Sequence, residues 1–324
     1  MKKIKILYAG SPLASSIVLK NLVAAQFECG FEIAGVLTNP PATRGRHSDL
    51  IPTEVSAVAR ASNIPVFEFD HLMSEAREAI APLGADLLVS FDYGRIFGPK
   101  FLALFPLGGI NLHPSSLPKY RGCTPVPAAI LNGDKNLGVT VQKLALQTDE
   151  GDILAQTEIP LDGTETTLSL MDGNGETSKI TEAGSKLLKK VLKEIAHSDS
   201  EIIGKKQSGE TSYTNFLKKE DGFIDWQKSA AEIERKIRAY TPFPLCSCLW
   251  NSVRVTILKA RVSESKTGEK AGTVLPYQKS VGIEIACGDG SILVATELQQ
   301  EKKKAMDYKS FINGARGFVG SVLC

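Results

Sequence analysis

The stretch INLHPSSLPKYRG, residues 110–122, decides how the fold is interpreted. It begins like a buried strand and then carries Asn111 and His113 two positions apart, ahead of two prolines and an Arg-Gly pair. Side chains at positions i and i+2 of a strand lie on the same face, so these two polar groups are expected together at the carboxyl end. In an open parallel sheet, ligands bind outside that edge. The stretch therefore predicts a strand that ends in a functional site.

Apolar runs rich in β-branched residues alternate with helical spacing up to about residue 200. We expect strands at 4–10, 32–38, 64–69, 85–91 and 108–113, with helices near 12–28, 53–62 and 71–81. This alternation predicts an α/β fold with a Rossmann-like, mostly parallel twisted sheet and helices on both faces. Two strands at 138–144 and 153–161 are expected to pair antiparallel at the sheet edge, and a helix is expected at 182–196.

A second domain is expected after the polar segment 197–215, which lacks a strong period and is interpreted as a linker. One helix, at 229–240, is followed by short β runs at 253–260, 271–277 and 281–298, the last interrupted by a Gly-Asp-Gly turn. Several short strands of this kind favour a small barrel of the oligonucleotide-binding (OB) type. The predicted domains are 1–204 and 205–324.

Composition places the 324-residue chain among ordinary globular proteins, since 43% of it is hydrophobic and no apolar run reaches the roughly 18–20 residues that span a bilayer. The charge is unevenly distributed. Residues 1–204 hold 19 Lys/Arg against 23 Asp/Glu, a balance of −4, whereas residues 205–324 hold 19 against 13, a balance of +6. The basic part is a candidate for binding an anionic partner, with a merely well-solvated surface as the open alternative.

Metal and nucleotide chemistry find little support in the sequence. The six cysteines are scattered, as reduced cytosolic thiols are, and the four histidines form no HxxxH or HExxH pair. The first strand-to-helix turn reads YAGSPLAS, which lacks the glycines of a dinucleotide site, and no phosphate-binding G-x-x-x-x-G-K-[ST] motif is present. We expect neither a metal site, an NAD-dependent dehydrogenase nor ATP-driven phosphoryl transfer.

An imidazole that acts as acid or base needs a partner that orients it, and LQTDEGDILAQ (146–156) supplies Asp149 and Asp152. We predict Asp149 as the third member of a catalytic trio with Asn111 and His113. Such a trio suits transfer of a carbonyl carbon to an amine, because the amide N–H and a protonated imidazole can stabilise the developing oxyanion. The alternative is that Asn111 and His113 are satisfied locally and that DEGD is an ordinary turn.

The same residues resemble a known family. INLHPSSLPKYRGCTPVPAAILNGD is similar to the N-x-H-x-S-L-L-P-x-x-R-G-x-x-P signature of enzymes that use 10-formyltetrahydrofolate, and GVTV with TDEGDIL is similar to their acidic loop. The resemblance implies a catalytic role for the trio and 10-formyltetrahydrofolate as formyl donor. It also implies that a turn touches the folate, namely Ser115, Ser116, Leu117 and Pro118. Ser116 departs from the family, which usually has leucine there.

Three further stretches resemble the methionyl-tRNA branch of this family: YAGSPLAS, LTNPPATRGR (37–46), and IDWQKSAAEIERKIRAYTPFP (224–244) with KKKAM (302–306). This resemblance implies formyl transfer to the α-amino group of methionyl initiator tRNA. Arg44 and Arg46 would lie near the acceptor end, and the basic C-terminal domain would hold tRNA phosphates. We accordingly expect a cytoplasmic monomer that binds initiator methionyl-tRNA and folate.

Phe91 and Tyr93 are expected to line the pterin slot, with packing in the core as the open alternative. A formyltransferase acting on a nucleotide-linked amino sugar is the rival function within the enzymes. A non-catalytic RNA-binding protein with a decayed core is the rival from another class. The two glycines within 171–179, in a stretch that is helical in relatives, have no evident explanation.

Overall fold

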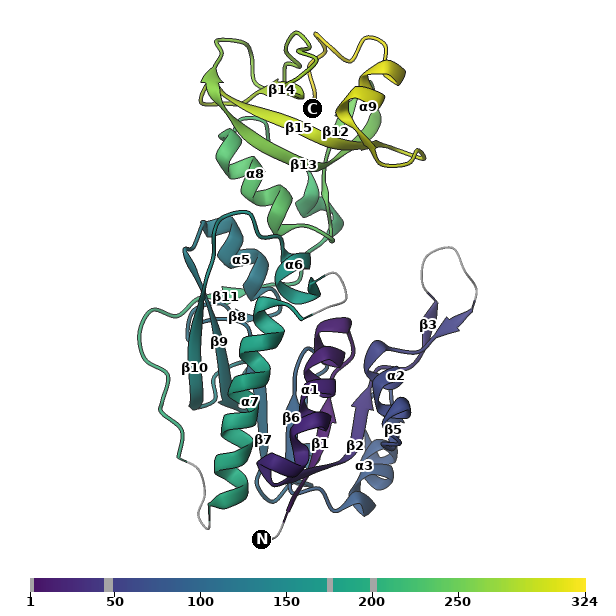
Figure 1. Ribbon diagram of the computed structural model, residues 1–324, viewed down its shortest axis with the longest axis vertical. Helices are drawn as coiled ribbons and strands as arrows, with labels where there is room; N and C mark the ends of the chain where they lie inside the picture. The colour runs from purple at the N-terminus through teal and green to yellow at the C-terminus, as the bar shows by residue number, and fades with distance from the viewer. Residues whose placement is uncertain (1–2, 44–48, 174–176, 199–202) are drawn as a thin grey trace. The chain divides into compact units, whose positions relative to one another are not determined.

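The computed structural model describes residues 3–43, 49–173, 177–198 and 203–324 (Figure 1). The chain divides into two compact units, which are described one at a time. The first comprises Met1–Pro125, Asn136–Pro160 and Ser169–Thr214; the second comprises Val126–Lys135, Leu161–Leu168 and Asn215–Cys324. The predicted boundary after residue 204 stays a prediction.

A seven-stranded sheet forms the centre of the first unit, in the order β10-β9-β7-β6-β1-β2-β5. Its strands are β1 (Ile4–Ala9), β2 (Phe31–Thr38), β5 (Val66–Glu68), β6 (Leu87–Ser90), β7 (Gly109–His113), β9 (Asn136–Lys143) and β10 (Ile153–Pro160). The pairs β1/β2, β2/β5, β1/β6 and β6/β7 are parallel, whereas β7/β9 and β9/β10 are antiparallel. The predicted parallel sheet with two antiparallel strands at its edge is confirmed.

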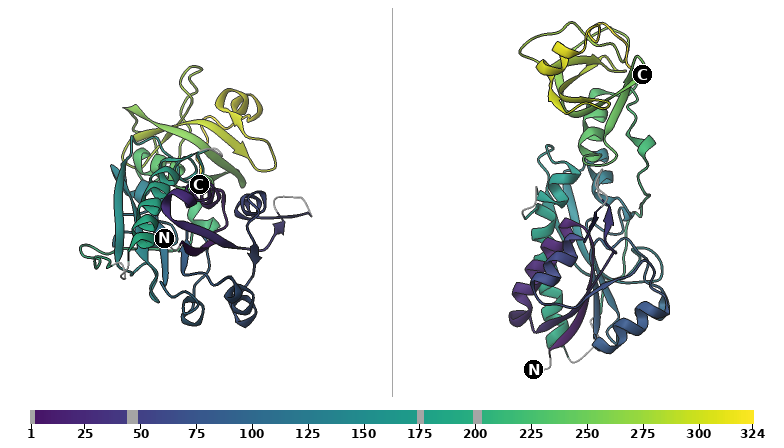
Figure 2. Two further views of the ribbon diagram at one scale, coloured as in Figure 1. Left: turned by 60° about the horizontal axis from the view of Figure 1, so that its bottom comes forward. Right: turned by 90° about the vertical axis from the view of Figure 1, so that its right-hand side faces the viewer.

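Helices cover both faces of this sheet, as predicted. Helices α1 (Leu13–Cys29) and α7 (Lys179–His197) lie side by side on one face, and α3 (Ser74–Ile80) lies on the other (Figures 1 and 2). The Asn21 amide donates to the Ser185 hydroxyl over 3.0 Å and so ties α1 to α7. Ser178 caps α7 by accepting from the Thr181 N–H, a contact worth about 1 kcal/mol. The remaining described elements of this unit are short: α2 (Glu54–Ala61), α4 (Pro99–Leu102), η1 (Ala81–Leu83), β3 (Ala42–Thr43), β4 (Leu50–Ile51), β8 (Arg121–Gly122) and β11 (Tyr213–Thr214).

The first turn of the sheet is closed by the protein's own side chains. A Cβ at Gly10 would lie 1.8 Å from the Ser15 hydroxyl oxygen, so only glycine fits beside the start of α1. The Ser15 hydroxyl donates to the Phe91 carbonyl over 2.7 Å and thereby joins α1 to the end of β6. Ser15 therefore occupies the space directly beside Gly10.

The second unit contains an antiparallel sheet in the order β12-β13-β15-β14, with β16 paired to β15. Its strands are β12 (Cys246–Trp250), β13 (Val253–Lys266), β14 (Ile283–Ala286), β15 (Ser291–Gln300) and β16 (Met306–Asp307). The helices that lie wholly or mostly in its ranges are α5 (Pro125–Asn132), α8 (Ala230–Ala239) and α9 (Tyr308–Gly314), with the 3₁₀ turn η3 (Lys219–Gly222). Helix α6 (Thr167–Met171) begins in the residues of this unit and ends in those of the first. The predicted fold class, a mostly parallel α/β sheet followed by a separate β domain, is confirmed, and the second domain is an antiparallel sheet. Closure of that sheet into the expected OB-type barrel stays a prediction.

Two stretches differ from expectation. Residues 271–277 form only isolated bridges, in which Thr273 pairs with Val322 and Val274 with Ile285, because turns at either end keep the run from pairing as a continuous strand. The second half of the expected linker pairs with the first unit, where β11 lies parallel to β8. Among the residues that the structure describes, no helix is long and apolar enough to cross a membrane.

Candidate active site

Asn111 and His113 lie at the carboxyl end of β7, as the strand period predicts. Asn111 is flanked by Ser90 of β6 and Gln142 of β9, and His113 pairs with Thr140. His113 is 5% exposed, whereas Asn111 is only partly buried. No described residue forms a hydrogen bond with the Asn111 side chain, so its amide N–H is available to a bound group.

The two ring nitrogens of His113 have different surroundings. Its Nε2 lies 2.8 Å from the Tyr120 carbonyl oxygen, which can only accept a hydrogen bond. This partner assigns a proton to Nε2 and leaves Nδ1 as the nitrogen that can take up another. Nδ1 lies 3.6 Å from Asp149 Oδ2, close enough for the carboxylate to stabilise the cationic ring. The imidazole is therefore arranged to act as a base through Nδ1.

Two hydrogen bonds hold the Asp149 carboxyl group beside this ring. Its Oδ2 accepts from the Gly122 N–H over 2.8 Å, and its Oδ1 accepts from Gln142 Nε2 over 2.7 Å. The backbone at Asp149 is left-handed, with φ of 55°, a conformation that costs a non-glycine residue about 1–3 kcal/mol. Contacts around the loop offset that cost, and they place Asp149 rather than Asp152 against His113.

Gly151 allows the loop that carries Asp149 to lie against β9. A Cβ at position 151 would come within 1.7 Å of the Lys143 carbonyl oxygen, a separation that no side chain can adopt. The Lys143 N–H donates to the Asp152 carbonyl over 2.9 Å and completes the contact. Only glycine at position 151 therefore permits this close approach of the loop to β9.

The predicted folate turn is mostly committed to internal contacts. Ser115 is fully buried; its hydroxyl donates to the Lys119 carbonyl over 2.6 Å, and its own carbonyl accepts from Thr140 Oγ1 over 2.6 Å. Leu117 is 3% exposed and Pro118 is buried, joined by a cis peptide bond. Ser116 keeps some exposure, and its hydroxyl lies 3.4 Å from Glu158 Oε1. A role for this turn in folate binding stays a prediction.

The other predicted site residues are not brought to the trio by side-chain contacts. Phe91 is 1% and Tyr93 is 3% exposed, and the Tyr93 ring stacks on Phe97 at a centroid distance of 5.4 Å within an apolar cluster. Both rings are packed in the core, which was the open alternative for them. Their predicted role in lining a pterin slot stays a prediction. Arg44 and Arg46 lie outside the described residues.

Sequence reasoning missed three residues that support the trio. Gln142, 1% exposed, holds the Asp149 carboxylate. Gln207 contacts the loop backbone around Asp149, and Arg121 donates to Gln207, to Glu150 and to the Tyr213 hydroxyl. The glutamine within the otherwise apolar strand GVTVQKL was a signal for Gln142. The polar segment around Gln207 gave no signal of its contact with the loop.

Asp92 follows β6 at the same edge of the sheet, with φ of 51°. Asp92 is exposed to solvent on one side, while protein atoms surround its carboxyl group on the other. Desolvation by these surroundings raises the pKa of the Asp92 carboxyl to about 6, and the charge of Asp172 adds to the rise. The Asp92 carboxyl therefore titrates between its ordinary range and neutral pH.

Asp92→Asn is expected to raise the midpoint of thermal unfolding near neutral pH. The folded state binds the Asp92 proton more tightly than the unfolded chain, whose pKa is near the ordinary 3.8, so the ionised group destabilises the fold. This destabilisation is fully present above about pH 6 and is lost as the pH falls toward about 4. The gain should therefore be larger at about pH 7.5 than at about pH 4.5. Equal gains in unfolding midpoint at the two pH values would show that ionisation of Asp92 does not lower the stability of the fold.

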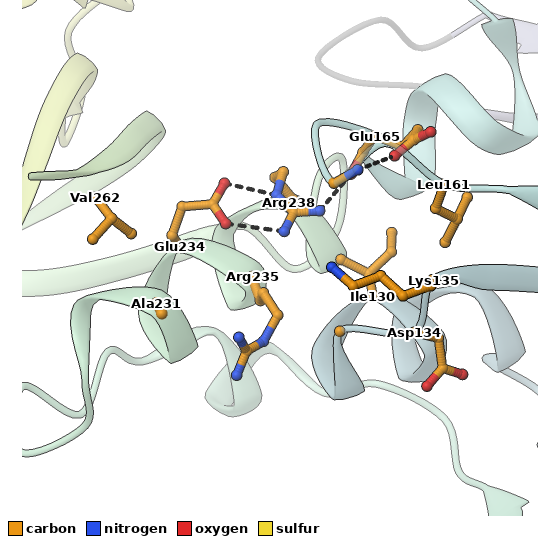
Figure 3. Close-up of a pocket in the computed structure, with 12 residues that line it drawn as sticks. Ile130, Asp134, Lys135, Leu161, Glu165, Ala231, Glu234, Arg235, Arg238 and Val262 are labelled. Carbon is orange, nitrogen blue, oxygen red and sulfur yellow. Dashed lines mark hydrogen bonds and ion pairs between the residues drawn. The ribbon is translucent and has the colours of Figure 1, made fainter.

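A separate cavity of about 240 Å³ lies in the second unit (Figure 3). Its charged lining is balanced, with three basic and three acidic side chains: Lys135, Arg235, Arg238, Asp134, Glu165 and Glu234. Arg238 binds both Glu234 oxygens, over 2.6 and 2.9 Å, and donates to the Glu165 carbonyl over 3.0 Å. Because these charges largely compensate one another, the cavity offers no strong selection for an anion.

Within the described part of the chain, no group of three or more His, Cys, Asp and Glu side chains could hold a metal ion.

Comparison with protein families finds two matching models. The one described as "Formyl transferase" covers residues 2–192, and "Formyl transferase, C-terminal domain" covers residues 217–316. A Treponema denticola protein named methionyl-tRNA formyltransferase is 42% identical, and the alignment covers 97% of this chain and 98% of that protein.

Solved structures share the fold at low identity. HypX from Aquifex aeolicus in complex with tetrahydrofolic acid superposes with a TM-score of 0.66 at 18% identity, over 99% of this chain and 49% of that one. An N-formyltransferase from Helicobacter canadensis in complex with folinic acid and dTDP-3-aminofucose gives 0.62 at 22% identity, over 90% of this chain and 98% of that one. At these identities the likeness establishes the fold.

Proposed function

The chain belongs to the methionyl-tRNA formyltransferase family, and on that premise we propose that it moves the formyl group of 10-formyltetrahydrofolate to the α-amino group of methionyl initiator tRNA. The product would be N-formylmethionyl-tRNA for translation initiation. The observation that carries this proposal is 42% identity to a protein of that name over nearly the whole length of both chains. The geometry of Asn111, His113 and Asp149 supplies the chemistry.

The trio has one role for each step of the reaction. The neutral amine nitrogen attacks the formyl carbon, and the carbonyl oxygen becomes an oxyanion that the Asn111 N–H can stabilise. His113 Nδ1 takes the proton that the amine loses, and Asp149, 3.6 Å away, stabilises the imidazolium. The bond from the formyl carbon to the folate nitrogen then breaks, and that nitrogen takes up a proton. If His113 passes its proton to that nitrogen, the enzyme returns to its starting state.

Direct transfer fits the site better than a formyl-enzyme intermediate. Cys123 follows the Arg121–Gly122 pair whose backbone holds Asp149, so its sulfur is the obvious candidate nucleophile. Cys123 is exposed, but neighbouring protein atoms desolvate its thiol and raise the pKa, and the Asp149 charge raises it further. The reactive thiolate is therefore disfavoured at neutral pH.

Recognition of tRNA is proposed for two parts of the chain. The basic C-terminal part, with its balance of +6, would contact phosphates, and Arg44 and Arg46 would lie near the acceptor end. Arg46→Ala is expected to raise the KM for methionyl-tRNA and to leave kcat unchanged, which steady-state kinetics with varied tRNA would measure. An unchanged KM would remove Arg46 from the interface.

We also propose a cytoplasmic monomer, to be checked by cell fractionation and size-exclusion chromatography.

The acceptor is tested by supplying formyl-labelled 10-formyltetrahydrofolate with one of three acceptors: methionyl initiator tRNA, uncharged initiator tRNA, or a nucleotide-linked amino sugar. The proposal expects label only in the methionyl ester, released as N-formylmethionine by mild base. Label in the sugar would favour the amino-sugar function instead. Absence of transfer to every acceptor would remove the proposed activity.

A further inference from the structure

The segment 205–214, which lies outside the signature motifs, packs against the loop that carries Asp149. Lys205 pairs with Ile153 at the start of β10, and β11 pairs with β8, so the chain between them runs along the loop that carries Asp149. Ser212 holds this segment to the chain after β7, since its hydroxyl accepts from the Tyr120 N–H over 2.9 Å. The segment 205–214 is therefore bound at both ends, with Gln207 between them.

The Gln207 amide is satisfied on both sides. Its Nε2 donates to the carbonyl oxygens of Asp149 and Gly151, over 2.7 and 2.8 Å. Its Oε1 accepts from Nε and Nη2 of Arg121, over 3.0 and 2.8 Å. A primary amide has two N–H donors and two acceptor lone pairs, so these four short contacts use its full capacity, and Gln142 Oε1 lies farther from Nε2, at 3.4 Å. Such a group fixes the backbone on which it acts.

We infer that Gln207 is a positioning residue that sets the Asp149 carboxylate against His113. Gln142 holds the carboxylate end of Asp149, and Gln207 holds its backbone carbonyl, so the residue is fixed from two directions. Asp149 adopts a left-handed conformation, which aspartate takes more readily than most non-glycine residues, and the Gln207 hydrogen bond to its carbonyl oxygen holds the loop in it. Gln207 touches no reacting atom and acts through Asp149. The inference rests on the proposed formyl transfer.

Gln207→Ala is expected to lower kcat by about 10- to 100-fold, the range in which small misplacements of a catalytic group fall, and to leave both KM values within about twofold. Gln207→Glu keeps the side-chain volume and the acceptor for Arg121 but loses both N–H donors, so it should show a similar loss. Ser208→Ala, at the exposed neighbouring position, is the matched control and should equal wild type. Hydrogen exchange of the peptide over 145–153 should be faster in both Gln207 variants.

The decisive comparison places Gln207→Ala in an Asp149→Ala background. If Gln207 acts through Asp149, its replacement should lower the remaining kcat by less than about twofold there, since the group that it positions is gone. A general loss of structure would multiply the two effects instead, and that result would overturn the inference. So would wild-type kcat and loop exchange in Gln207→Ala and Gln207→Glu. Failure of the wild-type protein to transfer formyl at all would count against the proposed function, not against Gln207.

Discussion

Replacement of His113 by alanine is expected to lower kcat for formyl transfer by about two to four orders of magnitude, the usual contribution of a positioned acid-base group. The alanine variant has no group to take the amine proton, and Asp149 has no cation to stabilise. Both substrates bind through other contacts, so their KM values should change little. Steady-state kinetics at saturating donor and saturating methionyl-tRNA measure the effect.

His71→Ala is the matched control for this experiment, because His71 is exposed and makes no described contact with the trio. Its kcat should equal that of the wild type. A His113→Ala variant that folds, binds tRNA and turns over within about tenfold of wild type would exclude the imidazole as the base.

Replacement of Asn111 by alanine is the second large effect, with an expected loss of about 100- to 1,000-fold in kcat, the range for removal of one oxyanion donor. Asn111→Asp keeps the shape but replaces the N–H donor by a negatively charged acceptor, so it should be at least as damaging. Pre-steady-state rates of formyl transfer with each variant would show whether the loss lies in the chemical step. An Asn111→Asp variant faster than Asn111→Ala would contradict oxyanion stabilisation by this amide.

Much of this site could be predicted from strand periodicity and loop chemistry. The i, i+2 spacing of Asn111 and His113 is a local property, and the structure places both at the carboxyl end of β7 as expected. Asp149 could be named because it lies beside a glycine in the loop between two expected antiparallel strands, and because the family resemblance implied the same residue. The structure brings its carboxylate to His113. Short-range rules therefore located these groups.

Other residues depended on register and on contacts distant in sequence. The pairing of Gln142 with Asn111 follows from the β7/β9 register, and a one-residue slip would have turned Gln142 to the opposite face. Gln207 is 58 residues from Asp149 and lies in a polar segment without a period, so no local pattern indicated their contact. The Tyr93 ring stacks on Phe97 within an apolar cluster, a contact that the sequence did not indicate, and its predicted place beside a pterin ring stays a prediction. Which face a side chain takes at a strand end is decided by packing that the sequence does not display.

A single-turnover experiment tests the central claim, direct formyl transfer by this trio, most directly. Enzyme in excess over methionyl initiator tRNA is mixed with formyl-labelled 10-formyltetrahydrofolate, quenched at short times, and the label is counted in donor, protein and methionyl ester. We predict that label passes to the ester without a protein-bound pool, at a rate that falls at least about 100-fold in His113→Ala. Labelled protein that forms and decays as fast as the ester appears, or an unchanged rate in His113→Ala, would contradict the account.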